Sequence, residues 1–313
     1  MPPGPYRLPR ASRCGLLRRR GAGLVRWVHF RDQPAITRVW LGPGVVRVAA
    51  DAPSREAALY GIERMAFLCG VRQDLSEFHA RFRRDPLLGP VIRRWPAIRP
   101  ERKAEPFEAL AFAITEQLIE GGRAYEIQRR LIRRWGTRSD CGEWRDAPAA
   151  EALAGSAPAE LEACDLAPKR ALAMTRVARE VAAGRIDLDE HEPAWRRLRA
   201  IREIGAWTVE KLALEGQGRD DMLPAGDLAY IKIVGRLAGL GRRATEDEVR
   251  EFFAPYAPFE GLAGTYVIAG RRALLRDAPP RWATGRMPPA AAPTEQGARP
   301  LVQGPWPGRY SFV

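Results

Sequence analysis

The stretch LRAIREIGAWTVEKLAL (198–214) decides the fold. Apolar residues recur at helical spacing on both sides of the tight segment IREIG, which predicts two helices joined by a short turn. Gly205 is expected to give the turn a backbone conformation that side chains forbid, and the second helix begins at Ala206 or Trp207. The free amides at the start of that helix form an anion site that can hold a DNA phosphate without reading the bases. An ordinary helical corner would give the same pattern.

The composition indicates a globular chain with a polyanionic partner. The 313 residues include 51 Lys and Arg against 38 Asp and Glu, a net charge of +13, and 46% of the residues are hydrophobic. This length predicts two or three domains, and the charge favours DNA or RNA as a partner, with anionic membranes and plain solubility as alternatives. The cysteines and histidines have no metal-ligand spacing, so no zinc site, iron–sulfur cluster or other cofactor is expected. No apolar run is long enough to span a membrane, which predicts a soluble cytoplasmic protein.

The chain divides into four segments. Residues 1–20 are basic and predicted to be partly disordered. Residues 21–82 contain three runs rich in β-branched and aromatic residues, at 24–30, 35–41 and 45–50, which predict an antiparallel sheet. Residues 83–276 show helical periodicity, with a strong helix opening at Pro106. Residues 277–313 are rich in proline and predicted to be a disordered tail.

A carboxylate follows the hairpin. In GRDDMLPAGDLAYIKIVGRL (218–237), Pro224 and Gly226 bend the chain, and Asp227 opens a helix. Such an Asp is usually only an N-cap. Beside a hairpin that is docked on DNA, however, the same carboxylate could stabilise an oxocarbenium-like sugar or orient a water towards its anomeric carbon.

The hairpin followed by a Pro/Gly-rich loop and Asp resembles the helix-hairpin-helix (HhH-GPD) DNA glycosylases, and within them the DNA-3-methyladenine glycosylase II (AlkA-like) branch. The resemblance covers roughly residues 22–275. Besides the hairpin and the loop at 220–228, it rests on the β-rich start and four further segments: DPLLGPVIRRWPAIRP (85–100), FEALAFAITEQLI (107–119), APKRALAMTRVARE (167–180) and PFEGLAGTYVIAG (258–270).

The resemblance implies a role for each matching position. Asp227 matches the catalytic Asp. Gln117 and Leu118 match the residues that probe the gap and wedge into DNA where the base flips out, although by composition alone Leu118 is an ordinary core residue. The phosphate-holding hairpin corresponds to five consecutive residues, Ile204, Gly205, Ala206, Trp207 and Thr208. A monovalent cation is typical of its backbone, near Ile201 and Ile204.

Trp207 stands where glycosylases that also cut the strand carry a Schiff-base Lys, so the resemblance implies a monofunctional enzyme. It is also a candidate wall of the base pocket, together with Tyr266, although a core Trp that packs the hairpin is the alternative. Purines alkylated at N3 or N7 are cationic, so their glycosylic bond is already weakened and no general acid is needed. The site then has only to extrude the base, offer an aromatic face and place one carboxylate at the sugar.

Three positions depart from the family pattern. Glu203 replaces the first Gly of the hairpin and puts a carboxylate against a phosphate-binding loop. Lys211 and Ile268 stand where relatives have aromatic pocket residues, which makes the range of lesions the weakest inference. Glu116 is expected to be a solvated or capping residue.

Together these patterns predict a mostly α fold with an N-terminal α+β lobe, resembling the TATA-binding-protein-like lobe of the family. Two helical subdomains follow, with Asp227 and Leu118 facing a cleft between them. The expected function is hydrolytic removal of alkylated bases such as 3-methyladenine and 7-methylguanine from duplex DNA, in base excision repair, by a monomer on a bacterial nucleoid. The alternatives are a non-catalytic helix-hairpin-helix protein that binds distorted duplex and a glycosylase for another lesion. The latter would need pocket hydrogen-bond donors for a neutral leaving base, and no such donor is evident in the sequence.

Overall fold

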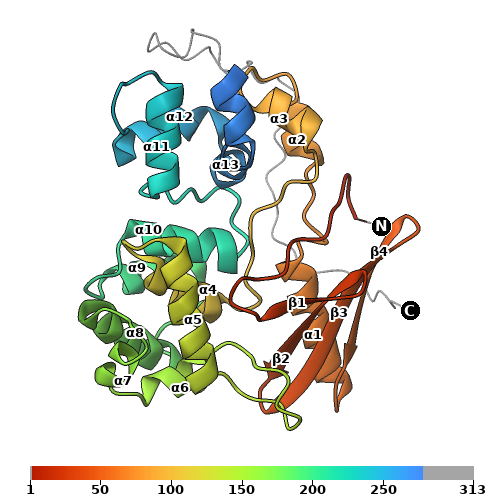
Figure 1. Ribbon diagram of the computed structural model, residues 1–313, viewed down its shortest axis with the longest axis vertical. Helices are drawn as coiled ribbons and strands as arrows, with labels where there is room; N and C mark the ends of the chain where they lie inside the picture. Colours follow the sequence, from red (N-terminus) through yellow and green to blue (C-terminus); the bar gives the residue numbers. More distant parts are fainter. Residues whose placement is uncertain (1, 278–313) are drawn as a thin grey trace.

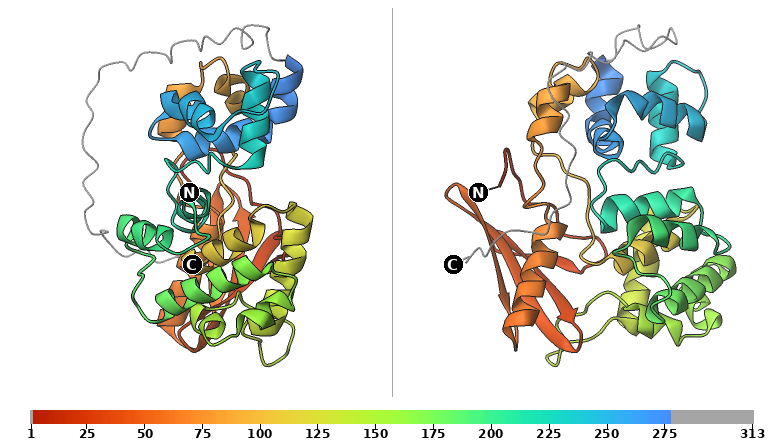
Figure 2. Two further views of the ribbon diagram at one scale, coloured as in Figure 1. Left: turned by 90° about the vertical axis from the view of Figure 1, so that its left-hand side faces the viewer. Right: turned by 180° about the vertical axis from the view of Figure 1, so that it is seen from behind.

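The computed structural model describes residues 2–277, which form three lobes (Figure 1). A sheet lobe holds the strands and α1, a hairpin lobe holds α4 to α10, and a composite lobe combines α2 and α3 with α11 to α13. The two further views show the same separation (Figure 2). The chain is mostly helical with one small antiparallel sheet, as the sequence predicted. The predicted tail lies outside the described residues, apart from Asp277, which ends α13.

The sheet has four strands in the order β1-β2-β3-β4: β1 (Leu17–Arg20), β2 (Gly23–Phe30), β3 (Gln33–Gly42) and β4 (Val45–Asp51). All pairings are antiparallel, and Trp27 lies opposite Ile36. The segment before residue 21, predicted to be partly disordered, contains an ordered strand at its end. Leu16 and Leu17 are buried, and β1 pairs with β2, so apolar burial and ladder hydrogen bonds order it despite its arginines.

Helix α1 (Arg55–Leu68) covers one face of the sheet. Ser54 caps it by accepting the amide of Ala57 at 3.2 Å. Leu24 and Val39 of the sheet pack against Met65 of the helix. The small core of this lobe is thus formed between one helix and one sheet face.

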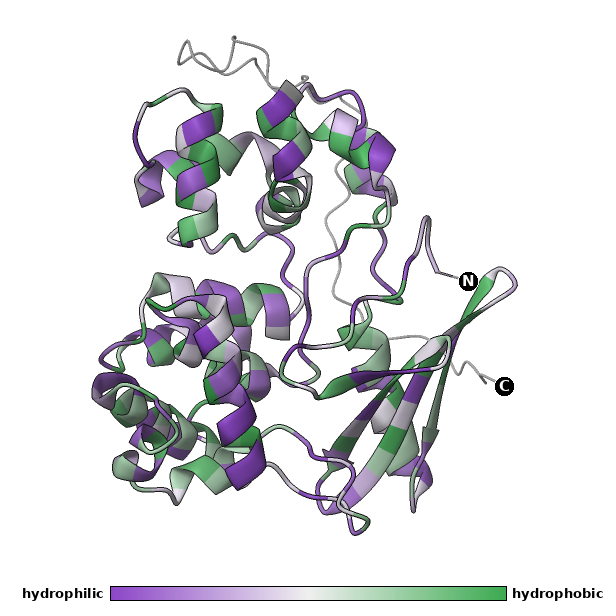
Figure 3. Ribbon diagram, in the orientation of Figure 1, coloured by the Kyte–Doolittle hydropathy of each residue, from purple (hydrophilic) through white to green (hydrophobic). Residues whose placement is uncertain are grey.

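The hairpin lobe is a cluster of short helices around one apolar core. Its elements are α4 (Pro106–Glu116), α5 (Gly121–Trp135), α6 (Ala150–Ala154), α7 (Pro158–Glu162), α8 (Pro168–Ala182), α9 (His191–Arg199), α10 (Ala206–Lys211) and the π-helical turn η1 (Leu212–Gly216). Leu110 and Ile114 of α4 lie at the centre of the core. Hydrophilic and hydrophobic residues alternate along these helices (Figure 3), which gives each an apolar face to bury.

The composite lobe joins two distant parts of the chain. It contains α2 (Ser76–Phe82), α3 (Leu88–Arg94), α11 (Leu228–Leu237), α12 (Glu246–Phe253), η2 (Ala254–Tyr256) and α13 (Glu260–Asp277). Phe78 and Phe82 of α2 pack in one core with Tyr266 of α13. The boundary predicted at residue 82 is therefore too late, because these phenylalanines are buried in the helical lobe rather than under the sheet.

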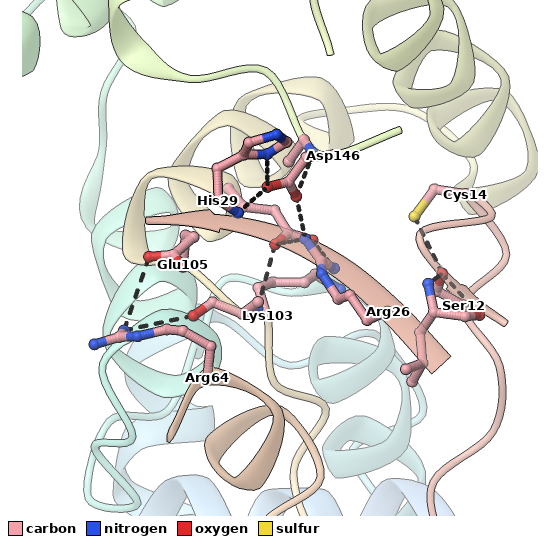
Figure 4. Close-up of polar contacts among 12 residues, drawn as sticks. Ser12, Cys14, Arg26, His29, Arg64, Lys103, Glu105 and Asp146 are labelled. Carbon is pink, nitrogen blue, oxygen red and sulfur yellow. Dashed lines mark hydrogen bonds and ion pairs between the residues drawn. The ribbon is translucent and has the colours of Figure 1, made fainter. Parts of the chain in front are cut away.

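A buried ionic network joins the sheet lobe to the hairpin lobe (Figure 4). Arg26 of β2 donates to both oxygens of Glu108 in α4, at 3.1 and 2.8 Å, and to Oδ1 of Asp146 at 3.1 Å. His29 donates its backbone amide to Oδ2 of the same Asp146 at 3.1 Å. Arg26 and Glu108 are each 2% exposed, so the pairing satisfies charges that water cannot reach.

None of the described helices combines the length and apolar character needed to cross a membrane.

Candidate DNA-binding and base-excision site

The predicted hairpin consists of α9, a turn over residues 200–205 and α10. The amide of Ile204 donates to the carbonyl of Ile201 at 3.0 Å, and Ile204 is buried at 4% exposure. Ile204 therefore anchors the turn to the core of the hairpin lobe, whereas Gly205 is exposed.

The backbone conformation that disfavours side chains lies at Glu203 rather than at Gly205. Glu203 has φ +73°, in the left-handed region that favours glycine, whereas Gly205 is extended with φ −94°. A Cβ at Gly205 would meet no atom within 4 Å. The expectation that Gly205 adopts a backbone conformation that side chains forbid is thus wrong. This glycine leaves open space above the first amides of α10, and the turn places a glutamate where the conformation calls for glycine.

Gln117 and Leu118 lie next to the hairpin, at the end of α4. Gln117 donates from Nε2 to the carbonyl oxygen of Glu203 and to Oγ1 of Thr208, both at 2.9 Å. Leu118 follows with φ +55° and is 98% exposed. The core interpretation of Leu118 is therefore wrong. An apolar side chain projects fully into solvent from a strained backbone position that is tied to the hairpin through Gln117.

Asp227 caps α11 and faces the hairpin. Its Oδ1 accepts the amide of Ala229 at 2.8 Å, which is the N-cap contact. Within residues 2–277, its Oδ2 accepts only a long hydrogen bond from Nε1 of Trp207, at 3.4 Å. The structure thus brings Asp227 to the partly exposed indole of Trp207, with one carboxylate oxygen engaged in the cap and the other weakly held.

A charged pair fixes the hairpin against the composite lobe that carries Asp227. Arg250 of α12 donates to Oε1 of Glu210 in α10 at 2.6 Å and also bridges Glu246 in its own helix. Glu210 is only 6% exposed. Burial raises the pKa of Glu210, and Arg250 counteracts that effect. The distance between the hairpin and the carboxylate of Asp227 therefore depends on the contact between Arg250 and Glu210, which the sequence did not reveal.

An ionic cluster lies beside Trp207. The ammonium of Lys211 contacts Oε2 of Glu116 at 2.7 Å and Oε1 of Glu215 at 2.8 Å, and it lies 5.6 Å from the Trp207 ring centroid. Lys103 extends the cluster towards Glu215 at 3.5 Å. Glu116 is thus a partner of Lys211 rather than a solvated or capping residue. The i,i+4 spacing of Lys211 and Glu215 was a signal for this pair, whereas the contacts of Glu116 and Lys103 arise only from the fold.

Burial alone would lower the pKa of Lys211, but Glu116 and Glu215 outweigh it and raise this pKa far above its usual value. Burial opposes ionisation of Glu116 as well, yet Lys211 and Lys103 lower its pKa. The Lys211–Glu116 pair is therefore charged at neutral pH.

Tyr266 does not line a pocket. It is 0% exposed, its hydroxyl donates to the carbonyl of Pro96 at 3.1 Å, and it lies 2.9 Å from Nε2 of His79. Ile268 packs against the same core. The pocket role predicted for Tyr266 is wrong, because α13 turns this side chain into the core of the composite lobe.

A large open groove lies away from these residues, between the sheet lobe and the loop around residues 137–152. Its volume is about 1600 Å³, and its lining includes Trp27, Tyr60, Glu105 and Asp146 but none of the predicted site residues. Tyr60 donates to Glu105 at 2.6 Å, and burial raises the pKa of Glu105 to about 7. Figure 4 shows Arg64 beside Glu105. The groove is thus separate from the hairpin and Asp227.

Among the described residues, no cluster of His, Cys, Asp or Glu side chains could hold a metal ion. A monovalent cation on the hairpin backbone stays a prediction. The carbonyl of Ile201 accepts the amide of Ile204, which leaves it one lone pair for such a cation.

Comparison with known proteins agrees with this geometry. The family model described as "HhH-GPD superfamily base excision DNA repair protein" matches residues 112–258, which include both the hairpin and Asp227. The chain is 25% identical over 204 residues to a DNA-3-methyladenine glycosylase of Bacillus subtilis, covering 62% of this chain and 66% of the relative. It is 28% identical over 178 residues to DNA-3-methyladenine glycosylase 1 of Schizosaccharomyces pombe, covering 54% of this chain and 75% of the relative.

Solved structures share the fold. A 3-methyladenine DNA-glycosylase from Archaeoglobus fulgidus matches with a TM-score of 0.69 at 19% identity, over 81% of this chain and 88% of that one. An 8-oxoguanine glycosylase/lyase of Clostridium acetobutylicum in complex with double-stranded DNA matches with a TM-score of 0.65 at 16% identity, over 84% and 91%. At these identities the likeness extends to the fold alone.

Proposed function

We propose that this chain, whose residues 112–258 match the family model of the HhH-GPD superfamily of base excision DNA repair proteins, is a monofunctional DNA glycosylase for alkylated bases. It would hydrolyse the N-glycosylic bond of cationic purines such as 3-methyladenine and 7-methylguanine in duplex DNA and leave an abasic site. The names of the two curated relatives support alkylated bases as the substrate class.

The position of Asp227 is the observation that carries this proposal. One oxygen of its carboxylate caps α11, and the other has a single weak contact with Trp207. A carboxylate held in this way can stabilise positive charge on a deoxyribose whose base is leaving, and it can orient the water that attacks C1′. A cationic base needs no acid to depart, so one carboxylate is sufficient for the reaction.

The surrounding residues supply the DNA contacts that the reaction requires. Gly205 leaves the start of α10 open to a phosphate, and the side chain of Arg202 beside it is 79% exposed. Leu118, fully exposed and adjacent to the hairpin, would fill the gap that opens when a base leaves the stack. Because phosphate contacts dominate such binding, affinity should fall steeply with salt.

Two features support hydrolysis without strand cutting. Trp207 offers no amine at the Schiff-base position. Lys211, one helical turn further on, is held as an ammonium by Glu116 and Glu215, and a protonated amine is not a nucleophile. We therefore expect the abasic product to be nicked only after alkali treatment.

The test compares wild type with Asp227→Asn on methylated duplex DNA, in single-turnover assays of released base. Asn is as good an N-cap as Asp, so α11 should keep its start while the negative charge is lost. We expect base release to fall by at least 100-fold with DNA binding intact. Asp247→Asn, which changes an exposed carboxylate in the first turn of α12, should match wild type.

Three results would contradict parts of the proposal. An Asp227→Asn variant as active as wild type would remove Asp227 from the reaction. Wild-type binding to DNA without any base release would favour a non-catalytic protein that recognises distorted duplex. Nicking without alkali, or a borohydride-trapped adduct, would contradict the monofunctional assignment.

A further inference from the structure

Lys211 occupies one face of Trp207, the residue that contacts Asp227. Its ammonium lies 5.6 Å from the ring centroid, and the indole Nε1 reaches Oδ2 of Asp227 at 3.4 Å. The cation and the carboxylate are therefore linked through one partly exposed aromatic side chain. A base that is drawn towards Asp227 and stacks on Trp207 would meet this ammonium.

The ammonium is held in place and keeps one free donor. Of its three N–H bonds, one points to Glu116 and one to Glu215, at 2.7 and 2.8 Å. Glu116 is itself held by Nε2 of Gln128 at 3.1 Å. The contacts of Lys211 in the described part of the chain thus use two of its three N–H bonds, and the ring of Trp207 lies beside the ammonium. A donor fixed by its own partners loses little entropy when it binds a ligand.

We propose that Lys211 is a specificity-determining residue that donates a hydrogen bond to the flipped base and lets the site release neutral purines bearing a carbonyl group. Deaminated or oxidised purines form this class. The inference rests on the proposed glycosylase function and extends it, since a neutral purine leaves as an anion and needs a donor that a cationic alkylpurine does not need.

The reaction balances without any group besides water. The bond between C1′ and N9 breaks, and its electron pair goes to the purine. Water adds to C1′ and passes its proton through Asp227 to solvent. The departing purine spreads its negative charge onto the carbonyl oxygen, which accepts the Lys211 hydrogen bond, and then takes a proton from solvent. Charge-assisted donors stabilise such anions more than neutral donors do.

The test measures single-turnover release of hypoxanthine and of 7-methylguanine from otherwise identical duplexes. Wild type should release both. Lys211→Met should lose about 10- to 100-fold in hypoxanthine release, the effect of one charge-assisted hydrogen bond, while 7-methylguanine release changes by no more than about threefold. Lys211→Arg, which keeps the charge and the donors, should restore part of the hypoxanthine activity.

Lys103→Met is the matched control. Lys103 belongs to the same ionic cluster, where it contacts Glu101 at 2.6 Å and Glu215 at 3.5 Å, whereas the contact with Trp207 is made by Lys211. Its loss should leave the ratio of the two activities at the wild-type value. If Lys211→Met and Lys103→Met lower both activities equally, the cluster is structural and the inference fails.

The two proposals fail in different ways. Release of 7-methylguanine but not of hypoxanthine by wild type would overturn the inference and leave the alkylbase glycosylase standing. Release of neither base, with binding to duplex DNA intact, would overturn the proposed function itself.

Discussion

Replacing Glu203 by glycine should stabilise the folded chain and strengthen its binding to duplex DNA. Glu203 holds φ +73° in the hairpin turn, and its side chain makes only a 3.6 Å ion pair with the exposed Arg202. The hydrogen bond from Gln117 goes to the carbonyl of Glu203, so glycine would keep it. The substitution therefore removes strain and charge, and the contact that it loses is the exposed ion pair with Arg202.

The size of the effect follows from one gain and two losses. A left-handed conformation costs an L-residue about 1–2 kcal/mol. Glycine reduces the resulting gain in stability by about 0.4–1 kcal/mol, because it makes the unfolded chain more flexible. The ion pair with Arg202 contributes less than about 0.5 kcal/mol, since both partners are exposed. We expect a net gain of about 0.5–1 kcal/mol, or about 1–2 °C in Tm for a chain of this size.

Glu203→Gln separates the two contributions, because it removes the charge and keeps a side chain in the left-handed conformation. Thermal unfolding should place Glu203→Gly above both Glu203→Gln and wild type. Anisotropy titrations with duplex DNA should show both variants binding more tightly than wild type at low salt, with the difference shrinking as salt rises. If Glu203→Gly is no more stable than Glu203→Gln, the backbone at this position is not strained and the reasoning fails.

Two further predictions concern the region between the sheet and the hairpin lobe. Arg26→Met should lower the free energy of unfolding in urea by about 3–5 kcal/mol, because Glu108 and Asp146 would lose their buried cation. Arg20→Met removes an exposed ion pair between Arg20 of β1 and Glu143, so it should lower the free energy of unfolding by less than about 1 kcal/mol. If Arg26→Met and Arg20→Met lower the free energy of unfolding equally, this account of the buried network is contradicted. Glu105 has a folded pKa of about 7 against an ordinary 4.5, so its contribution to stability is full below pH 4.5 and is lost as the pH rises through 7. The free energy of unfolding of Glu105→Gln, measured relative to wild type, should therefore rise by about 1–3 kcal/mol between pH 5 and pH 8. A difference between the two proteins that does not change with pH would refute this prediction.

The errors of prediction have physical causes that can be traced to particular residues. Residues 1–20 looked disordered because arginine dominates their composition, yet Leu16 and Leu17 find a sheet edge to bury against. The resemblance suggested Tyr266 as a pocket residue because it lies near Ile268, the position where relatives have an aromatic pocket residue. Only the packing of α13 against α2 shows that it lies in the core.

Local patterns in the sequence by themselves determined the helices, the antiparallel sheet, the hairpin and the Asp that caps α11, because periodicity, turn residues and caps act over a few neighbours. Tertiary structure alone decided which of these meet. It brought Gln117 onto the hairpin, Asp227 to Trp207, and Lys211 between Glu116 and Glu215. It also placed the left-handed residue of the turn at Glu203. Contacts between residues 20 to 95 positions apart leave no periodic signal in the chain, since they depend on how the lobes pack.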